Sequence, residues 1–318
     1  MRKLCVAALA SALLLNTTAA AHELDGVSTA SFEKLRESDS RIHSISHKLR
    51  TGNAAFCENT QYESGILLDD AARYGDPAAI RTANAINGDI FIHAIAEGSA
   101  AARAGLMAGQ EVVSLSGYEV TQATFDPEQS WLRAGELNAM LAGFAPEMTV
   151  TLASIDTPVT LRSELACTGY VELVPHYSRA TTDGVRVSIG RDFVGLTYPD
   201  DELAAVIAHE LAHIFVGHTQ WLKSRGNKRR DIRQTEREAD RLMPWILANA
   251  GYDPAAAARF MRRWGPDNNG GLRLWRKHDG WDERLAMIEA ELPKIRASLA
   301  RDGTADWKRD FTPQFARD

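Results

Sequence analysis

Two histidines and a glutamate stand together in the pentapeptide His209-Glu210-Leu211-Ala212-His213. The surrounding run, Ala204–Val216, is predicted to be helical, and residues four apart lie on the same face of a helix. Two imidazoles at that spacing can bind one zinc ion, and Glu210 can reach a water molecule bound to that ion. This arrangement is typical of metal-dependent hydrolysis at neutral pH.

The flanking residues argue against the alternative, a surface helix that carries two solvated histidines. The helix is apolar on nearly every side, through Leu203, Ala204, Val206, Ile207, Ala208, Leu211, Ala212, Ile214, Phe215 and Val216. A helix of this kind is buried. A charged glutamate buried between two histidines needs a partner, and a metal ion supplies one.

A catalytic zinc ion takes three protein ligands and keeps one position open. The third ligand must come from elsewhere, and Gln234–Ala250 is predicted to be a second long helix with three carboxylates near its start. Glu236 and Asp240 share a helix face, whereas Glu238 lies about 200° round and points away. We expect Glu236 to be the third ligand and Asp240 to accept a hydrogen bond from the far nitrogen of His209. The alternative is a salt-bridged helix surface.

An H-E-x-x-H helix followed by E-x-E-A-D on a second helix resembles metallopeptidase family forty-eight, the gluzincins of the HtpX and Oma type. The family signature D-E-L-A-x-V-x-A-H-E-L-A-H is similar to Asp201–His213. The resemblance runs from about Thr182 to Leu292 and implies an α+β, zincin-like domain with a helical active-site region and a small sheet. It implies one zinc ion per chain, held by His209, His213 and Glu236.

The resemblance also implies roles for residues around the metal. Glu210 would be the general base and later the proton donor, and Asp240 would support a ligand from behind. The family's late H-P-x-x-x-x-R element is matched by His278 to Arg284, without the proline. His278 would stabilise an oxyanion, and Arg284 would orient the oxyanion or a carboxylate; a capping or solvated role is the alternative for both.

Two further expectations concern the surroundings of the site. His218, five residues past His213, falls off the ligand face and is expected to be structural. The strand Val185–Ile189 is expected to lie at the edge of the site and to hold a substrate extended by backbone pairing.

Residues 57–167 resemble a PDZ domain of the bacterial periplasmic type. The segment Gly98–Gln110 matches a short helix that runs into an A-G-L-x-x-G-D turn, with Ala100 in place of proline and Gln110 in place of aspartate. PDZ domains bind extended peptides at a sheet edge, and the candidate binding loop here is Gly65–Leu68. The alternative is a small α+β insertion with no binding role.

Cysteines lie at the two ends of this module, Cys57 and Cys167. In an oxidising compartment an even pair indicates one disulfide, which would staple the neck of an inserted domain. The alternative is two separate buried thiols.

Residues 1–21 have the features of a secretory signal peptide: Arg2 and Lys3, the apolar stretch Leu4–Leu15, and small residues before His22. Residues 22–56 then form an N-terminal helical segment, with Phe32–Leu49 predicted as an amphipathic helix, and residues 168–318 form the catalytic domain. No later segment is apolar for about 18 residues, so the mature chain is expected to be soluble, without a transmembrane anchor, and periplasmic or extracellular.

The chain has 318 residues and a formal charge of −6, which does not suggest a nucleic-acid surface. The basic cluster Lys223–Arg233 is expected to be mostly a solvated loop, with an anionic-ligand site as the alternative. The sequence thus predicts an exported zinc metalloendopeptidase whose PDZ-like module positions protein or peptide substrates. The family resemblance implies a role in envelope protein quality control. The alternative is a non-catalytic PDZ-type adaptor on a peptidase scaffold.

Overall fold

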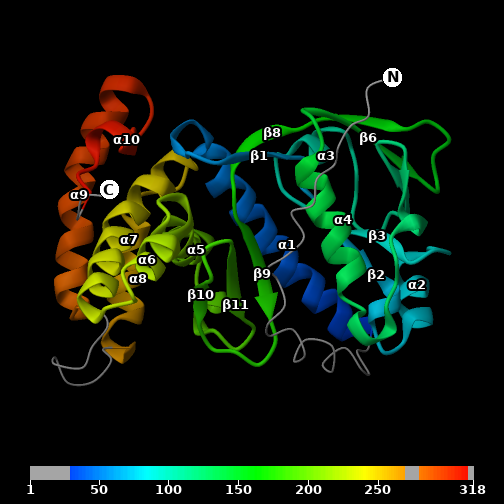
Figure 1. Ribbon diagram of the computed structural model, residues 1–318, viewed down its shortest axis with the longest axis horizontal. Coiled ribbons are helices and arrows are strands. Elements are labelled where there is room, and N and C mark those ends of the chain that lie inside the picture. The colour runs from blue at the N-terminus through cyan, green and yellow to red at the C-terminus, as the bar shows by residue number, and fades with distance from the viewer. Residues whose placement is uncertain (1–28, 269–278, 314–318) are drawn as a thin grey trace.

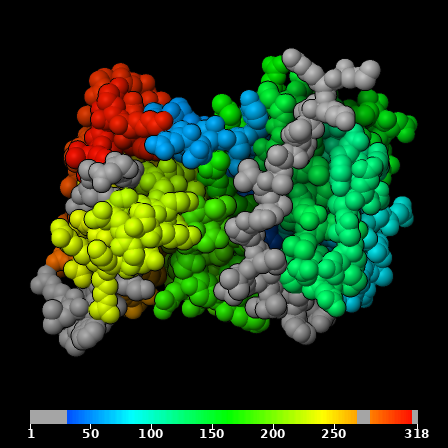
Figure 2. Space-filling view, in the orientation of Figure 1, coloured from blue at the N-terminus to red at the C-terminus, as the bar shows by residue number. Residues whose placement is uncertain are grey.

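The computed structural model describes residues 29–268 and 279–313 and has a mixed α+β architecture. Figure 1 shows a helical lobe and a strand-rich lobe side by side, with the long helix α1 (Thr29–Gly52) running between them. In the space-filling view the helical lobe is yellow to red and the strand-rich lobe is mainly cyan to green (Figure 2). Among the described residues, no helix is long and apolar enough to cross a membrane.

The helical lobe contains α5 (Asp200–Phe215), α6 (His218–Ser224), α7 (Arg229–Asn249), α8 (Ala256–Trp264), α9 (Trp281–Asp302) and α10 (Trp307–Asp310). Helix α5 begins with three acidic residues in its first turn, which suit the positive end of the helix dipole. As the sequence predicts, α5 buries most of its residues, and it packs against α7 and α8. The pair α5 and α7 forms the frame on which the predicted ligands stand.

A three-stranded sheet lies against α5. Its strands are β9 (Tyr170–Val174), β10 (Ala180–Thr182) and β11 (Arg186–Gly190), in the order β10-β11-β9. Strand β11 pairs antiparallel with β10 and parallel with β9. The expectation that Val185–Ile189 holds a substrate by backbone pairing is therefore wrong, because both sides of β11 are already paired. Strand β10 lies at the edge instead and contacts α5.

The strand-rich lobe follows the first long helix in the chain. Its strands are β1 (Thr60–Glu63), β2 (Ile66–Asp70), β3 (Ile90–Ile95), β4 (Val112–Leu115), β5 (Tyr118–Glu119), β6 (Glu147–Leu152), β7 (Val159–Arg162) and β8 (Glu164–Cys167). Its helices are α2 (Pro77–Asn84), α3 (Ala100–Arg103) and α4 (Leu132–Gly143). One sheet has the order β5-β4-β6-β7 and a second pairs β2 with β3. Both glycines of the predicted turn, Gly105 and Gly109, have left-handed backbone angles (φ +79° and +87°), which only glycine adopts readily.

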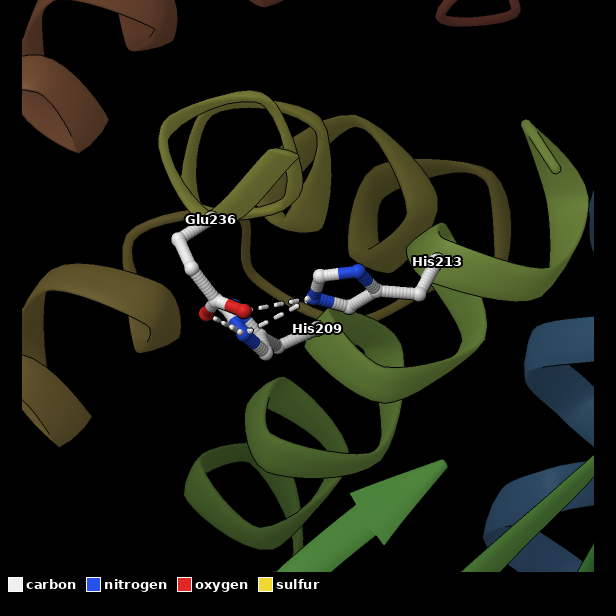
Figure 3. Close-up of side chains that lie close together, drawn as sticks. All are labelled: His209, His213 and Glu236. Carbon is white, nitrogen blue, oxygen red and sulfur yellow. Dashed lines mark hydrogen bonds and ion pairs between the residues drawn. The ribbon is translucent and has the colours of Figure 1, made fainter. Parts of the chain in front are cut away.

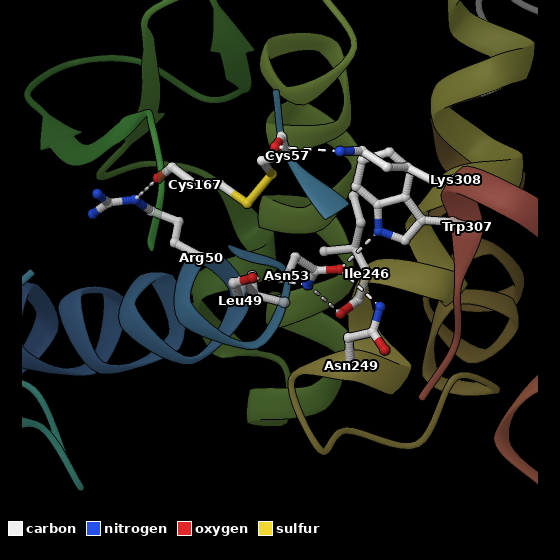
Figure 4. The surroundings of a disulfide bond; sticks show 9 residues. All are labelled: Leu49, Arg50, Asn53, Cys57, Cys167, Ile246, Asn249, Trp307 and Lys308. Carbon is white, nitrogen blue, oxygen red and sulfur yellow. Dashed lines mark hydrogen bonds between the residues drawn. A yellow bond between two sulfur atoms is a disulfide. The ribbon is translucent and has the colours of Figure 1, made fainter. Parts of the chain in front are cut away.

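The neck between the lobes is closed by backbone pairing and by a disulfide. Strands β1 and β8 pair antiparallel, with Thr60 opposite Cys167. Cys57 and Cys167 are bonded, with their Cα atoms 5.6 Å apart (Figure 4). Beneath them, Asn53 donates to the carbonyl of Ile246 on α7, at 3.0 Å. Its side-chain oxygen accepts from the indole of Trp307, also at 3.0 Å. The predicted disulfide is thus confirmed, and it sits on the helical lobe.

Helix α1 belongs to the cores of both lobes. The predicted span Phe32–Leu49 is confirmed and extends by three residues at each end. Near its start, Phe32 packs edge-on against Tyr74, with ring centroids 5.5 Å apart, in a core shared with the strand-rich lobe. Further along, Ile42, Ile45 and Leu49 are buried in the core of the helical lobe.

Two expectations about local structure are corrected. The basic cluster is mostly helical, because α6 and α7 extend into it and leave only Arg225–Lys228 between them. The last helix is also predicted to kink or break at Pro293, and it is not broken there, because α9 continues through that residue. Buried apolar side chains on either side, Ile288 and Ile295, pack into the core and hold that helix together despite the lost hydrogen bond.

Candidate metal centre

Helices α5 and α7 bring three potential metal ligands together (Figure 3). The Nε2 atoms of His209 and His213 lie 3.4 Å apart. Glu236 places one carboxylate oxygen 3.4 Å from Nε2 of His209 and the other 3.7 Å from Nε2 of His213. No other group of three such side chains within the described ranges could hold a metal ion.

The spacing of these atoms fits a tetrahedral metal. Zinc bonds to nitrogen and carboxylate oxygen are about 2.0–2.2 Å long, which puts the ligand atoms of a tetrahedron about 3.3–3.6 Å apart. The two histidine nitrogens are 3.4 Å apart, within that range, and each has an oxygen of Glu236 at 3.4 or 3.7 Å. The side chains are 12%, 9% and 17% exposed for His209, His213 and Glu236, so the site is accessible from solvent rather than sealed. Three protein ligands together with access to solvent are typical of a catalytic site rather than of a closed structural one.

His209 is held from behind by a buried carboxylate. Its Nδ1 lies 3.1 Å from Asp240, which is the contact that the sequence predicts. Asp240 in turn receives two hydrogen bonds of 2.6 Å from the guanidinium of Arg284, on α9. Because Asp240 occupies the Nδ1 side of the imidazole, Nε2 is left facing Glu236 and His213.

These contacts shift the protonation equilibria. Burial alone would lower the pKa of His209, but Asp240 and Glu236 outweigh burial and raise the pKa to about 10. Burial alone would raise the pKa of Asp240, but Arg284 and His209 outweigh it and lower that pKa to about 2. The site therefore favours a positive charge at His209, which a bound cation supplies as well as a proton does.

His213 has a different neighbour, which the sequence does not reveal as part of the site. The Nδ1 atoms of His213 and His218 lie 3.0 Å apart. Behind His218 lies Glu238, whose carboxylate oxygen is 3.9 Å from Nε2 of His218. The only signal in the sequence is indirect: a histidine shortly after the second ligand and a carboxylate two residues after the third.

The structure ties the remaining predicted residues less directly to the metal ligands. Glu210 follows His209 on α5 and is partly exposed, beside the ligand group. Arg284 contacts the carboxylate of Asp240, and the sequence predicts that it orients the oxyanion or a carboxylate, without naming which one. His278 lies outside the described residues.

Comparison with known proteins agrees with this geometry. The model of peptidase family M48 matches residues 177–227, which contain both ligand histidines. Neither the curated proteins nor the solved structures gave a match to the chain. The family match and the His-His-Glu arrangement together show a zinc metallopeptidase whose ligands are His209, His213 and Glu236.

Proposed function

We propose that this metallopeptidase is an exported endopeptidase that cleaves protein substrates with Glu210 as general base, and that it acts in protein quality control in the cell envelope. The observation that carries the catalytic part of the proposal is the group His209, His213 and Glu236, three side chains close enough to share one metal ion, on and beside the helix that carries Glu210. Such a site is suited to hydrolysis, which needs no nucleophilic serine or cysteine.

The chain's own residues would divide the work as follows. Zinc, when bound, lowers the pKa of water and polarises a carbonyl group. Glu210 would take a proton from the attacking water and pass it to the nitrogen of the departing amine. Asp240 would fix the orientation of His209, and Arg284, through its two hydrogen bonds to Asp240, would act as a positioning residue. His278 is proposed to stabilise the oxyanion of the intermediate.

The substrate would lie extended along β10. This strand is at the edge of its sheet and contacts α5, the helix that carries both ligand histidines. An edge strand presents backbone N–H and C=O groups that pair with any extended peptide, which gives binding with little sequence preference.

The module of residues 57–167 is proposed to be a PDZ-like insertion that positions substrates. Its two turn glycines and its strand-rich core are in keeping with that fold. Export is supported by the disulfide at the base of the module, because disulfides persist in oxidising compartments. The signal-peptide expectation falls on residues outside the described part of the chain.

Casein hydrolysis by a Glu210→Gln variant tests the catalytic role. Gln keeps the size of the side chain but cannot accept the proton, so we expect activity to fall by about 10²–10⁴-fold or more. Zinc content, measured by metal analysis, should stay at one ion per chain because Glu210 is not a ligand. Full activity in this variant would refute the mechanism, and no activity in the zinc-loaded wild type would favour a non-catalytic adaptor.

A further inference from the structure

The second zinc ligand presents its outer nitrogen to another histidine inside the protein. Nδ1 of His213 lies 3.0 Å from Nδ1 of His218, and the two rings are tilted by 73°. His218 has no exposed surface. A hydrogen bond of this length between two imidazole nitrogens needs one N–H donor and one bare acceptor. The tautomer of each ring therefore depends on the other.

A buried carboxylate lies on the far side of His218. Glu238 is 0% exposed, and its Oε1 is 3.9 Å from Nε2 of His218. A carboxylate with no exposed surface is costly unless positive or hydrogen-bonding groups face it. Glu238 stands two residues past the zinc ligand Glu236 on α7, about 200° round the helix. Glu238 therefore faces His218 on the side away from the metal site, and His218 lies between Glu238 and the ligand His213.

A single glycine allows this arrangement. Helix α5 ends at Phe215 and α6 begins at His218, with Gly217 between them at φ +69°. That left-handed conformation is open to glycine at little cost. The turn it makes brings His218 back against His213, only five residues earlier, with ring centroids 4.8 Å apart.

Zinc binding at Nε2 of His213 would fix the direction of the hydrogen bond between the two histidines. A zinc-binding histidine is neutral, and His213 faces the metal centre with Nε2, so its proton sits on Nδ1. That N–H can donate only to a bare Nδ1 on His218. The proton of His218 is then on Nε2, on the side where Glu238 lies.

We infer that Glu238 and His218 form a buried relay that positions the zinc ligand His213, holding its ring in the tautomer and orientation in which Nε2 faces the metal. The carboxylates at positions 236, 238 and 240 of α7 then have three separate tasks. Glu236 binds zinc, Asp240 supports His209 directly, and Glu238 supports His213 through His218. The inference rests on the zinc site, so it can fail while the proposed peptidase mechanism stands.

The test is the zinc dissociation constant of the full chain, measured by competition with a chromogenic chelator. For His218→Ala we expect about 10–100-fold weaker zinc binding, the usual cost of losing a group that orients a ligand. His218→Asn should recover most of the affinity, because its side-chain oxygen replaces the Nδ1 acceptor. Glu238→Ala should weaken binding, and the double variant should bind no worse than His218→Ala, because the two residues act in series.

A matched control separates positioning from mere stability. His93 is another buried histidine, on β3, and its Nε2 lies 2.9 Å from Asp39. His93→Asn should lower the melting temperature of the zinc-free protein and leave the zinc dissociation constant unchanged. The inference is overturned if His218→Ala binds zinc as tightly as the wild type, or if His218→Asn is as impaired as His218→Ala. Additive losses in the double variant would remove Glu238 from the relay.

Discussion

Arg284 is connected to the first zinc ligand, His209, through one buried carboxylate. Its guanidinium is buried and bonds Asp240 through two nitrogens, each at 2.6 Å. Such paired contacts fix the carboxylate in place and favour its charged form. Asp240 is then a rigid acceptor for Nδ1 of His209, 3.1 Å away. Arg284 is thus linked through Asp240 to a ligand 75 positions earlier in the chain.

Substitution of Arg284 by Ala should leave Asp240 buried without its main counter-charge. Removing one member of a buried ion pair costs about 3–5 kcal/mol, so we expect a loss of that size in the free energy of unfolding of the zinc-free protein. Zinc affinity should fall with it, by about 10–100-fold. Denaturant titration and chelator competition measure the two quantities.

A suitable control is Asp279→Asn, which removes another carboxylate that is paired with an arginine of α7. This variant should keep its zinc affinity. If Arg284→Ala instead lowered only the catalytic rate, with stability and zinc affinity unchanged, Arg284 would contact the reacting atoms and not act through Asp240.

At this scale the sequence predicts the ligands well, because helix periodicity alone puts His209 and His213 on one face and Glu236 near Asp240. It does not predict the part played by His218. That contact depends on where α5 ends and how Gly217 turns the chain, and helix ends are the least readable part of a sequence.

Among the elements, β2 is the strand that a PDZ-like module would offer to a peptide, and its edge is already hydrogen-bonded within the protein. The backbone N–H and C=O of Leu68, on β2, both bond the side-chain amide of Asn138 on α4, each at 2.9 Å. This amide replaces the partner strand at that residue. A peptide that added to β2 would have to displace Asn138 first.

The substitution Asn138→Ala should therefore open the edge of β2. We expect the Leu68 amide to exchange its hydrogen faster, and the affinity for a labelled pool of peptides with a C-terminal valine to rise. Hydrogen exchange and fluorescence anisotropy report these changes. Faster exchange with no gain in peptide binding would mean that β2 is not a peptide site.

Helix α1 carries two histidines where it meets the strand-rich lobe. Nε2 of His43 is 3.0 Å from the carbonyl of Gly65, and Nε2 of His47 is 3.5 Å from Glu164. Burial lowers the pKa of both below the ordinary value of 6.5, against the opposing charge of Glu63. At a pH just below 6.5, the folded state thus binds fewer protons than the unfolded state.

Stability should therefore fall as the pH drops from about 6.5 toward the lowered pKa values, since unfolding then takes up protons. We expect the free energy of unfolding to be smaller at pH 5.5 than at pH 7.5. A double variant, His43→Gln with His47→Gln, should lose less over the same interval. The zinc site is the same in both proteins, so its own pH dependence cancels. Equal losses in the two proteins would show that these histidines do not contribute.

The helices and strands themselves are more predictable from the sequence than the elements that each one packs against or pairs with. The amphipathic pattern of α1 and the apolar α5 are visible in the sequence because each depends on local periodicity. The central place of β11 is not visible, since strand order depends on pairing between distant segments. The helical start of α7 is hidden by its run of charged residues, which looks like a loop.

For the whole molecule, the strand-rich lobe is tied to the helical lobe at more than one place. Helix α1 contributes side chains to both cores. The neck adds the pairing of β1 with β8 and the disulfide of Cys57 with Cys167, which are 110 residues apart in the chain. The ring of Phe56 packs on Trp307, with centroids 5.9 Å apart, so the C-terminal segment also seals the neck.

Replacing both cysteines with serine tests how far the neck supports the whole protein. A cross-link over so long a loop restricts the unfolded chain, and its removal costs about 2–5 kcal/mol of unfolding free energy. We expect that loss in denaturant titrations, with the zinc dissociation constant unchanged, because the ligands stand on α5 and α7 and not at the neck. Reducing agent should lower the stability of the wild type to that of the variant and leave the variant unaffected. Loss of zinc binding in the folded variant would show instead that the metal site depends on a closed neck.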